Sequence, residues 1–367
     1  MENGKKRYEI IDILKAIGII SVVIGHCGWR LPLTNFPIGK FVYSYHIMVF
    51  MFVLGFLFKS DEAKPYAYIG KTICGIGKLF ITYAILFALL HNVFVSFNMI
   101  NAKPWSMMDL GIKLVSTLCL TSGEVLLSAF WFLPMYIFIA ILFCCGFYFI
   151  KKRKYALVWH LLFVFVSMFL GVFLSHRNVF LTYHAQTSFL AIPVCYLGYI
   201  TKKYWDKITK FVPTYGALIS ALCILLLVQG LNIVIDVSQN KVGNTWLFYL
   251  VTFVGLYFCV SLAKCIDKFK ISSKIFCYIG KNSFHIMALH FMCIKLFDII
   301  YGAIIHADKS ILMKFPYSFN LPYVYYIVGI GLPLLLIAIV RGIKWLVVHY
   351  INKRKEKTKP QENEEVS

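Results

Sequence analysis

Residues 129–150 of the chain read AFWFLPMYIFIAILFCCGFYFI. The stretch contains no Asp, Glu, Lys or Arg. A helix needs about 20 apolar residues to cross the hydrocarbon core of a bilayer. Residues 129–150 therefore predict a transmembrane helix, and the question is how much of the chain resembles them.

The rest of the chain has the same apolar character. Of 367 residues, 60% are hydrophobic and only 14% are charged, and the mean hydropathy is +0.75. A water-soluble fold cannot bury so much apolar surface, so a soluble globular protein is excluded. The 33 Phe, 23 Tyr and 7 Trp residues suit contact with lipid tails and headgroups.

Working outward from 129–150, ten stretches are predicted to span the membrane. They are 10–27, 40–58, 73–97, 129–150, 155–175, 187–201, 211–235, 245–265, 275–298 and 321–350. We expect an all-α fold, a polytopic membrane helix bundle of about ten transmembrane helices. Residues 1–350 are predicted to form one integral-membrane domain, and residues 351–367 are predicted to form a disordered, polar and basic cytoplasmic tail.

The net charge of +21, from 37 Lys and Arg against 16 Asp and Glu, raises the question of nucleic-acid binding. Sorted by predicted loop, 24 basic residues lie on the side of the N-terminus, eight on the opposite side and five within spans. By the positive-inside rule both termini are expected to be cytoplasmic. Because the basic excess is then a topology signal, we expect no nucleic-acid partner.

Ionisable residues inside predicted spans are the best functional pointers, because each is costly in hydrocarbon. The first span, YEIIDILKAIGIISVVIGHCG at 8–28, contains Asp12, Lys15 and His26. Lys15 and His26 are eleven residues apart, which places them on one helix face about 16 Å apart. Lys15 is also explained by snorkelling to the headgroups or by pairing with Asp12, and His26 by an interfacial hydrogen bond.

Two further histidines are expected at the depth of His26. His46 lies six residues into the second predicted span, and His290 lies in the outer half of the ninth. His285 points about 140° away from His290, so at most one of these two faces a common site. Trp131 either belongs to the interfacial aromatic belt or lines a substrate pocket, and Glu124 is either solvated or functional.

A neutral imidazole is a competent general base for a hydroxyl group. A site near the outer face of the membrane suggests an extracytoplasmic acceptor. If the donor is made inside the cell, a polar track from Lys15 to His26 offers a route for an extended thioester arm whose anionic end stays near the basic inner rim.

At these residues the sequence resembles the acyltransferase type 3 family of bacterial integral-membrane acyltransferases. Lys15 and His26 match the basic residue and the histidine of the family's first helix. The second-helix motif is matched by Tyr45, His46, Phe50, Phe52, Gly55 and Phe56, with Met48 and Leu54 where the family usually has Pro and Ser. Residues 131–134 match its Trp-Phe-Leu-Pro stretch, and Gly280, Lys281, Asn282, Ser283 and His290 match its late motif.

The resemblance implies a multi-pass enzyme of the bacterial plasma membrane that O-acetylates a sugar hydroxyl. Acetyl-CoA from the cytoplasm would be the donor, with no permanently bound cofactor and no metal. The acceptor would be an extracytoplasmic or lipid-linked cell-surface glycan of the capsule or exopolysaccharide type. His26 would be the catalytic base and Lys15 would hold the donor. The remaining site residues implied are Asp12, His46, Trp131, Asn282, Ser283 and His290.

Two other functions stay open from the residues alone. A polytopic glycan transporter or flippase also contains intramembrane Lys, Asp and His, although its charged groups are expected to be spread through several helices. A non-catalytic membrane scaffold or sensor is the third. Oligomeric state is not determined by the sequence, and membrane lipids are expected to contact the predicted spans.

Overall fold

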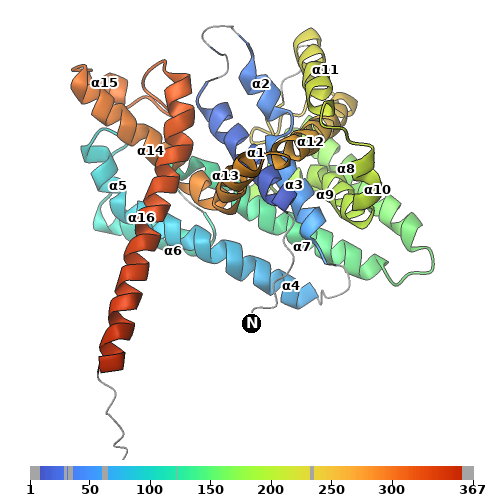
Figure 1. Cartoon of the computed structure of the whole chain (residues 1–367), viewed down its shortest axis with the longest axis horizontal. Helices are drawn as coiled ribbons and strands as arrows, with labels where there is room; N and C mark the ends of the chain where they lie inside the picture. Colours follow the sequence, from blue (N-terminus) through green and yellow to red (C-terminus); the bar gives the residue numbers. More distant parts are fainter. Residues whose placement is uncertain are drawn as a thin grey trace, which may run out of the picture.

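The computed structural model describes residues 9–28, 31, 36–59, 65–121, 123–231 and 235–357 (Figure 1). It is 80% helical. No strand occurs in these residues, where a single antiparallel bridge joins Asp236 to Lys241. The predicted all-α class is therefore confirmed.

The first half of the chain forms α1 (Glu9–His26), α2 (Ile38–Tyr43), α3 (His46–Leu57), α4 (Pro65–Thr72), the π-helix η1 (Ile73–Gly77), α5 (Lys78–Ser96), α6 (Met107–Leu118), the 3₁₀ segment η2 (Val125–Trp131), α7 (Phe132–Ile150) and α8 (Ala156–His176). The second half forms η3 (Thr182–His184), α9 (Ala185–Lys203), α10 (Trp205–Lys210), α11 (Gly216–Gly230), α12 (Thr245–Asp267), α13 (Lys270–Lys281), α14 (Ser283–Ile304), α15 (Lys309–Leu312) and α16 (Pro322–Lys357).

Seven helical stretches in the described residues are long and apolar enough to cross a membrane. They are Ile38–Leu57, Pro65–Ser96, Val125–Ile150, Ala156–His176, Thr245–Asp267, Ser283–Ile304 and Pro322–Lys353. A polytopic membrane bundle is thus confirmed. The first, sixth and seventh predicted spans form α1, α9 and α11, of which α1 contains three charged residues and α11 has 15 residues. The number ten and the cytoplasmic placement of both termini stay predictions.

The prediction of one continuous helix over 275–298 is wrong. The chain breaks at Asn282, where φ is −105° and ψ is 8°. Residues before the break belong to α13, which packs against α1, and the apolar span begins only at Ser283. The physical reason is local, because Asn competes with the helical backbone for hydrogen bonds and favours helix ends. The second predicted span breaks similarly between α2 and α3.

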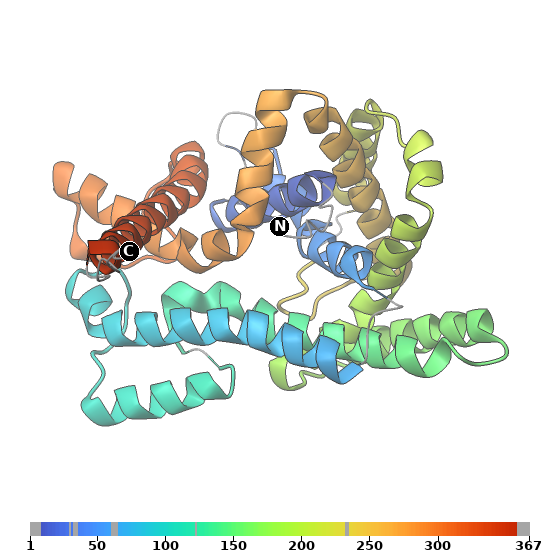
Figure 2. The same ribbon diagram turned by 60° about the horizontal axis from the view of Figure 1, so that its bottom comes forward.

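The first helix lies at the centre of the bundle. It packs against α2, α3, α12, α13, α14 and α16. Around this centre α3 packs on α9, and α4 and α5 run alongside η2 and α7 (Figure 2). The far end of α16 extends away from the other helices (Figure 1) and is exposed from Val340 to Lys353. Helix α16 continues to Lys357, and residues 358–367 of the expected tail lie outside the described residues.

Two glycines bring α3 and α9 into backbone contact. A Cβ atom at Gly55 would lie 1.8 Å from the carbonyl oxygen of Cys195, and one at Gly198 would lie 2.0 Å from that of Phe52. Small residues are typical of such interfaces in membranes, because close backbone approach increases van der Waals contact where no hydrophobic effect operates between helices.

We predict that Gly198→Ala destabilises the protein by about 1–3 kcal/mol, because the added methyl group displaces a backbone carbonyl rather than a flexible side chain. The measurement is the midpoint of thermal unfolding in detergent. Gly331→Ala is the matched control, since a Cβ atom there meets no atom within 4 Å. Its midpoint is expected to stay the same or rise, and equal losses in both variants would contradict the packing argument.

Candidate functional site

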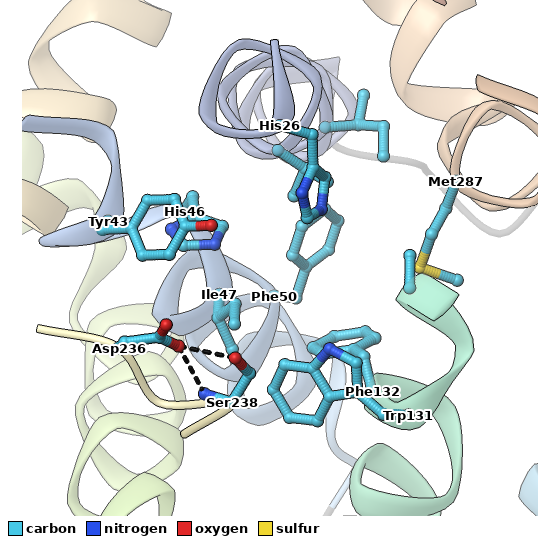
Figure 3. A pocket seen from close by; sticks show the side chains of 13 residues that line it. His26, Tyr43, His46, Ile47, Phe50, Trp131, Phe132, Asp236, Ser238 and Met287 are labelled. Atoms are coloured by element: carbon cyan, nitrogen blue, oxygen red, sulfur yellow. Dashed lines mark hydrogen bonds between the residues drawn. The ribbon is translucent and has the colours of Figure 1, made fainter. Parts of the chain in front are cut away.

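An open cavity lies beside the end of α1 that carries His26 (Figure 3). Its walls come from α1, α2, α3, η2, α7, α14 and the turn after residue 235. The lining residues are Ile19, Val22, His26, Tyr43, His46, Ile47, Phe50, Ala129, Trp131, Phe132, Asp236, Ser238 and Met287. Three predicted site residues, His26, His46 and Trp131, therefore share one cavity.

The cavity wall formed by α1 is the helix face predicted to connect Lys15 with His26. Ile19, Val22 and His26 all line the cavity. Lys15 is on the same face, one turn or about 6 Å before Ile19. The expected polar track along this face is wrong, because the wall between the two residues is apolar.

Lys15 pairs with Asp12, as one reading of the sequence proposed. The Lys15 Nζ atom lies 2.7 Å from Asp12 Oδ1, and Asp12 is 1% exposed. Helix α13 packs directly on this turn of α1, since a Cβ atom at Gly280 would lie 1.8 Å from the Asp12 carbonyl oxygen. The ion pair thus stands at the other end of the cavity wall from His26 and does not itself line the cavity.

His26 and His290 lie face to face. Their ring centroids are 5.4 Å apart with an interplanar angle of 24°, and Phe291 contacts both rings, at 4.8 Å and 4.0 Å. His46 lines the cavity with His26. The expected meeting of three histidines is therefore found, although His290 lies behind His26 and is not part of the cavity lining. His285 points elsewhere, with its Nδ1 2.7 Å from the hydroxyl of Tyr83.

Backbone carbonyls determine the tautomers of two of these histidines. His46 Nδ1 lies 3.0 Å from the carbonyl oxygen of Val42, and His290 Nδ1 lies 2.9 Å from that of Met287. A carbonyl oxygen only accepts, so both Nδ1 atoms carry a hydrogen and each neutral ring keeps its lone pair on Nε2. The His290 Nε2 atom is buried and has no hydrogen-bond partner among the described residues.

Three polar residues of the cavity were missed from the sequence. These are Tyr43, Asp236 and Ser238. Asp236 Oδ1 accepts hydrogen bonds from Ser238 N at 3.0 Å and from Ser238 Oγ at 2.6 Å, which is an Asx turn. The sequence contains a signal for this turn, because Asp236 and Ser238 are two positions apart and directly follow the predicted span 211–235. Asp236 and Ser238 lie just outside that span, where polar residues are usually solvated.

Asn282 and Ser283 lie away from the cavity, at the break between α13 and α14. Asn282 is 1% exposed; its Oδ1 accepts a hydrogen bond from Arg341 at 2.7 Å, and its Nδ2 donates to the Tyr278 carbonyl at 2.8 Å. Ser283 is the first residue of α14. These contacts connect the break between α13 and α14 with α16, on the side of the bundle where α13 meets Asp12.

Trp131 stands at the end of η2 with its ring 4.8 Å from that of His184. Glu124, just before η2, is buried rather than solvated, and its Oε2 lies 2.6 Å from Nδ1 of His91. Burial raises the pKa of Glu124, and the hydrogen bond with His91 opposes that shift. Trp105 stacks on His91, with the two ring centroids 3.7 Å apart. Because His91 is held in this way and binds Glu124 directly before η2, the His91–Glu124 pair anchors the segment that carries Trp131.

A comparison with protein families gives a match over most of the chain. Residues 8–342 match the model of the acyltransferase type 3 family, which is described as an acyltransferase domain. The match includes every helix that contributes to the cavity. Searches of the curated proteins and of the solved structures found no significant match.

We predict that Glu124→Ala lowers the stability of the protein by about 1–3 kcal/mol, because the buried ring nitrogen of His91 loses its carboxylate. Thermal unfolding in detergent measures the loss. Glu124→Gln keeps an oxygen at the same reach and is the matched control, expected to lose less. The same midpoint for wild type and Glu124→Ala would show that the pair does not anchor η2.

Proposed function

Because the chain belongs to the acyltransferase type 3 family and is a membrane acyltransferase, we propose that it O-acetylates a glycan. The donor is acetyl-CoA from the cytoplasm. The acceptor is a sugar hydroxyl of an extracytoplasmic or lipid-linked cell-surface glycan of the capsule or exopolysaccharide type, at a bacterial plasma membrane. The observation that carries the proposal is an open cavity in which two imidazoles, a carboxylate and an indole meet.

In this reaction His26 takes the proton of the sugar hydroxyl as its oxygen attacks the carbonyl carbon of the thioester. The new carbon–oxygen bond forms, the carbon–sulfur bond breaks, and the departing thiolate of CoA receives the proton from His26. The stacked rings of His290 and Phe291 support this role, because they hold the imidazole plane of His26 in one orientation.

A sugar fits the polar and aromatic groups on the other walls. Asp236 and Ser238 offer oxygen atoms that accept hydrogen bonds from sugar hydroxyls, and Trp131 offers a flat apolar surface for a pyranose ring. His46, with its tautomer held by the Val42 carbonyl, presents a lone pair on Nε2 to a second hydroxyl. These groups favour a polyhydroxylated acceptor over an apolar one.

The wall formed by α1 favours entry of the donor from the opposite end. Ile19 and Val22 provide an apolar surface for the acyl thioester arm, and Lys15 lies about one turn beyond them for an anionic part of the donor. The separation of about 16 Å between Lys15 and His26 matches an extended arm. No observation among the described residues favours the transporter alternative over this arrangement.

We expect His26→Gln to reduce acetyl transfer at least about a hundredfold, which is the lower range for loss of a general base. The assay follows radiolabel from acetyl-CoA into glycan, using purified protein in detergent and the surface glycan of cells that lack this gene. His349→Gln is the control, because His349 is exposed on the far end of α16. Full transfer by folded His26→Gln protein would refute the proposal.

Lys15→Met should raise the KM for acetyl-CoA about tenfold while changing kcat less, because a single charge-assisted contact with the donor is lost. Steady-state kinetics at saturating glycan separates the two parameters. Thermal unfolding checks that the variant is folded despite the loss of the pair with Asp12. An unchanged KM together with a kcat as low as that of His26→Gln would exclude a donor role for Lys15.

A further inference from the structure

The turn at residues 235–243 separates the catalytic cavity from a second hollow. Asp236 and Ser238 line the cavity, whereas Asn240 and Lys241 line a hollow that is open to solvent. Asp236 and Lys241 are joined by two backbone hydrogen bonds of 2.8 Å each. Since the Cα atoms of such a pair lie about 5.5 Å apart, the two hollows adjoin across the width of one turn. That width is comparable with one pyranose unit.

The second hollow is polar and has a positive charge. Its opposite wall is the end of α8, with Ser175, His176 and Asn178. Lys241, which is exposed, supplies the charge, and no Asp or Glu lies among the lining residues. This lining contrasts with the catalytic cavity, where the charged side chain is the carboxylate of Asp236.

The turn between the two hollows contains one buried polar atom without a partner in the described residues, Oδ1 of Asn240. Asn240 is 2% exposed, and its Nδ2 donates to the carbonyls of Leu174 and Val179, which leaves Oδ1 unmatched. Buried polar groups normally have a hydrogen-bond partner, so the Oδ1 atom of Asn240 is placed to accept a hydrogen bond from water or a ligand.

We propose that the second hollow binds an acidic sugar of the acceptor glycan, next to the neutral sugar that is acylated in the catalytic cavity. This inference rests on the proposed function and specifies its substrate class. Asp236 disfavours a carboxylate in the cavity by like-charge repulsion, and Lys241 favours one in the hollow by a charge-assisted hydrogen bond. The acceptor is thus a chain in which a uronic acid adjoins the acylated sugar.

The test is binding of two probes, tetragalacturonate and neutral maltotetraose, to the purified full chain in detergent. Because the hollow is open to solvent, tetragalacturonate can place a terminal unit there and leave the cavity beside Asp236 empty. Wild type is expected to bind tetragalacturonate at least about tenfold more tightly than maltotetraose, and this preference should shrink as salt is added. Lys241→Gln should weaken tetragalacturonate binding about tenfold and leave maltotetraose binding unchanged.

Two further variants keep the test independent of misfolding. Lys309→Gln removes an equally exposed lysine that lines neither hollow and should bind both probes like wild type. Asn178→Asp places a negative charge in the hollow at a left-handed backbone position (φ 50°) that Asp tolerates, and it should also weaken tetragalacturonate binding. The proposal is overturned if tetragalacturonate does not bind, if the two probes bind alike, or if Lys241→Gln behaves like Lys309→Gln.

Failure of this inference is distinguishable from failure of the proposed function, because probe binding requires neither acetyl-CoA nor transfer. Charge-selective binding that depends on Lys241, combined with no acetyl transfer by wild type, would support the acidic-sugar site and refute the proposed reaction. Acetyl transfer that depends on His26, combined with equal binding of the charged and neutral probes, would support the proposed reaction and refute the acidic-sugar site.

Discussion

Close packing around α1 is the constraint on which the rest of the structure depends. Backbone contact between Gly280 and the carbonyl of Asp12 brings α13 onto one side of α1, while α3, α12 and α14 pack on others. A helix packed in this way holds its polar residues inside protein rather than in lipid, where each ionisable group is costly. His26 and the Lys15–Asp12 pair are therefore held in the bundle interior, with the apolar cavity wall between them.

The two ends of α1 therefore have different surroundings. Its His26 end meets His290, Phe291 and the cavity, and its Lys15 end meets α13. The proposed acyl donor and glycan acceptor differ in chemistry, and the two ends of the wall differ in the same way. The turn at 235–243 completes the proposed acceptor side, since it contributes Asp236 to the cavity and Lys241 to the neighbouring hollow.

Helical periodicity was sufficient to predict the shared face of Lys15 and His26, because both lie on one continuous helix. It also separated His285 from His290, and the structure places these two rings against different partners. Periodicity could not predict the break at Asn282, since a polar side chain within an apolar run also occurs in continuous helices. The sequence left Glu124 either solvated or functional, because its partner, His91, is distant in the sequence and comes near only when α5 packs against η2.

The sequence by itself determined the membrane-spanning all-helical class, the family and the identity of the histidines, because these follow from composition, local spacing and motif. Only the tertiary structure decided which residues form the cavity. The stack of His26 on His290, the entry of Asp236 and Ser238, and the exclusion of Asn282 from the lining depend on contacts between helices. Such contacts are set by packing among residues far apart in the chain, for which a single sequence contains no direct measure.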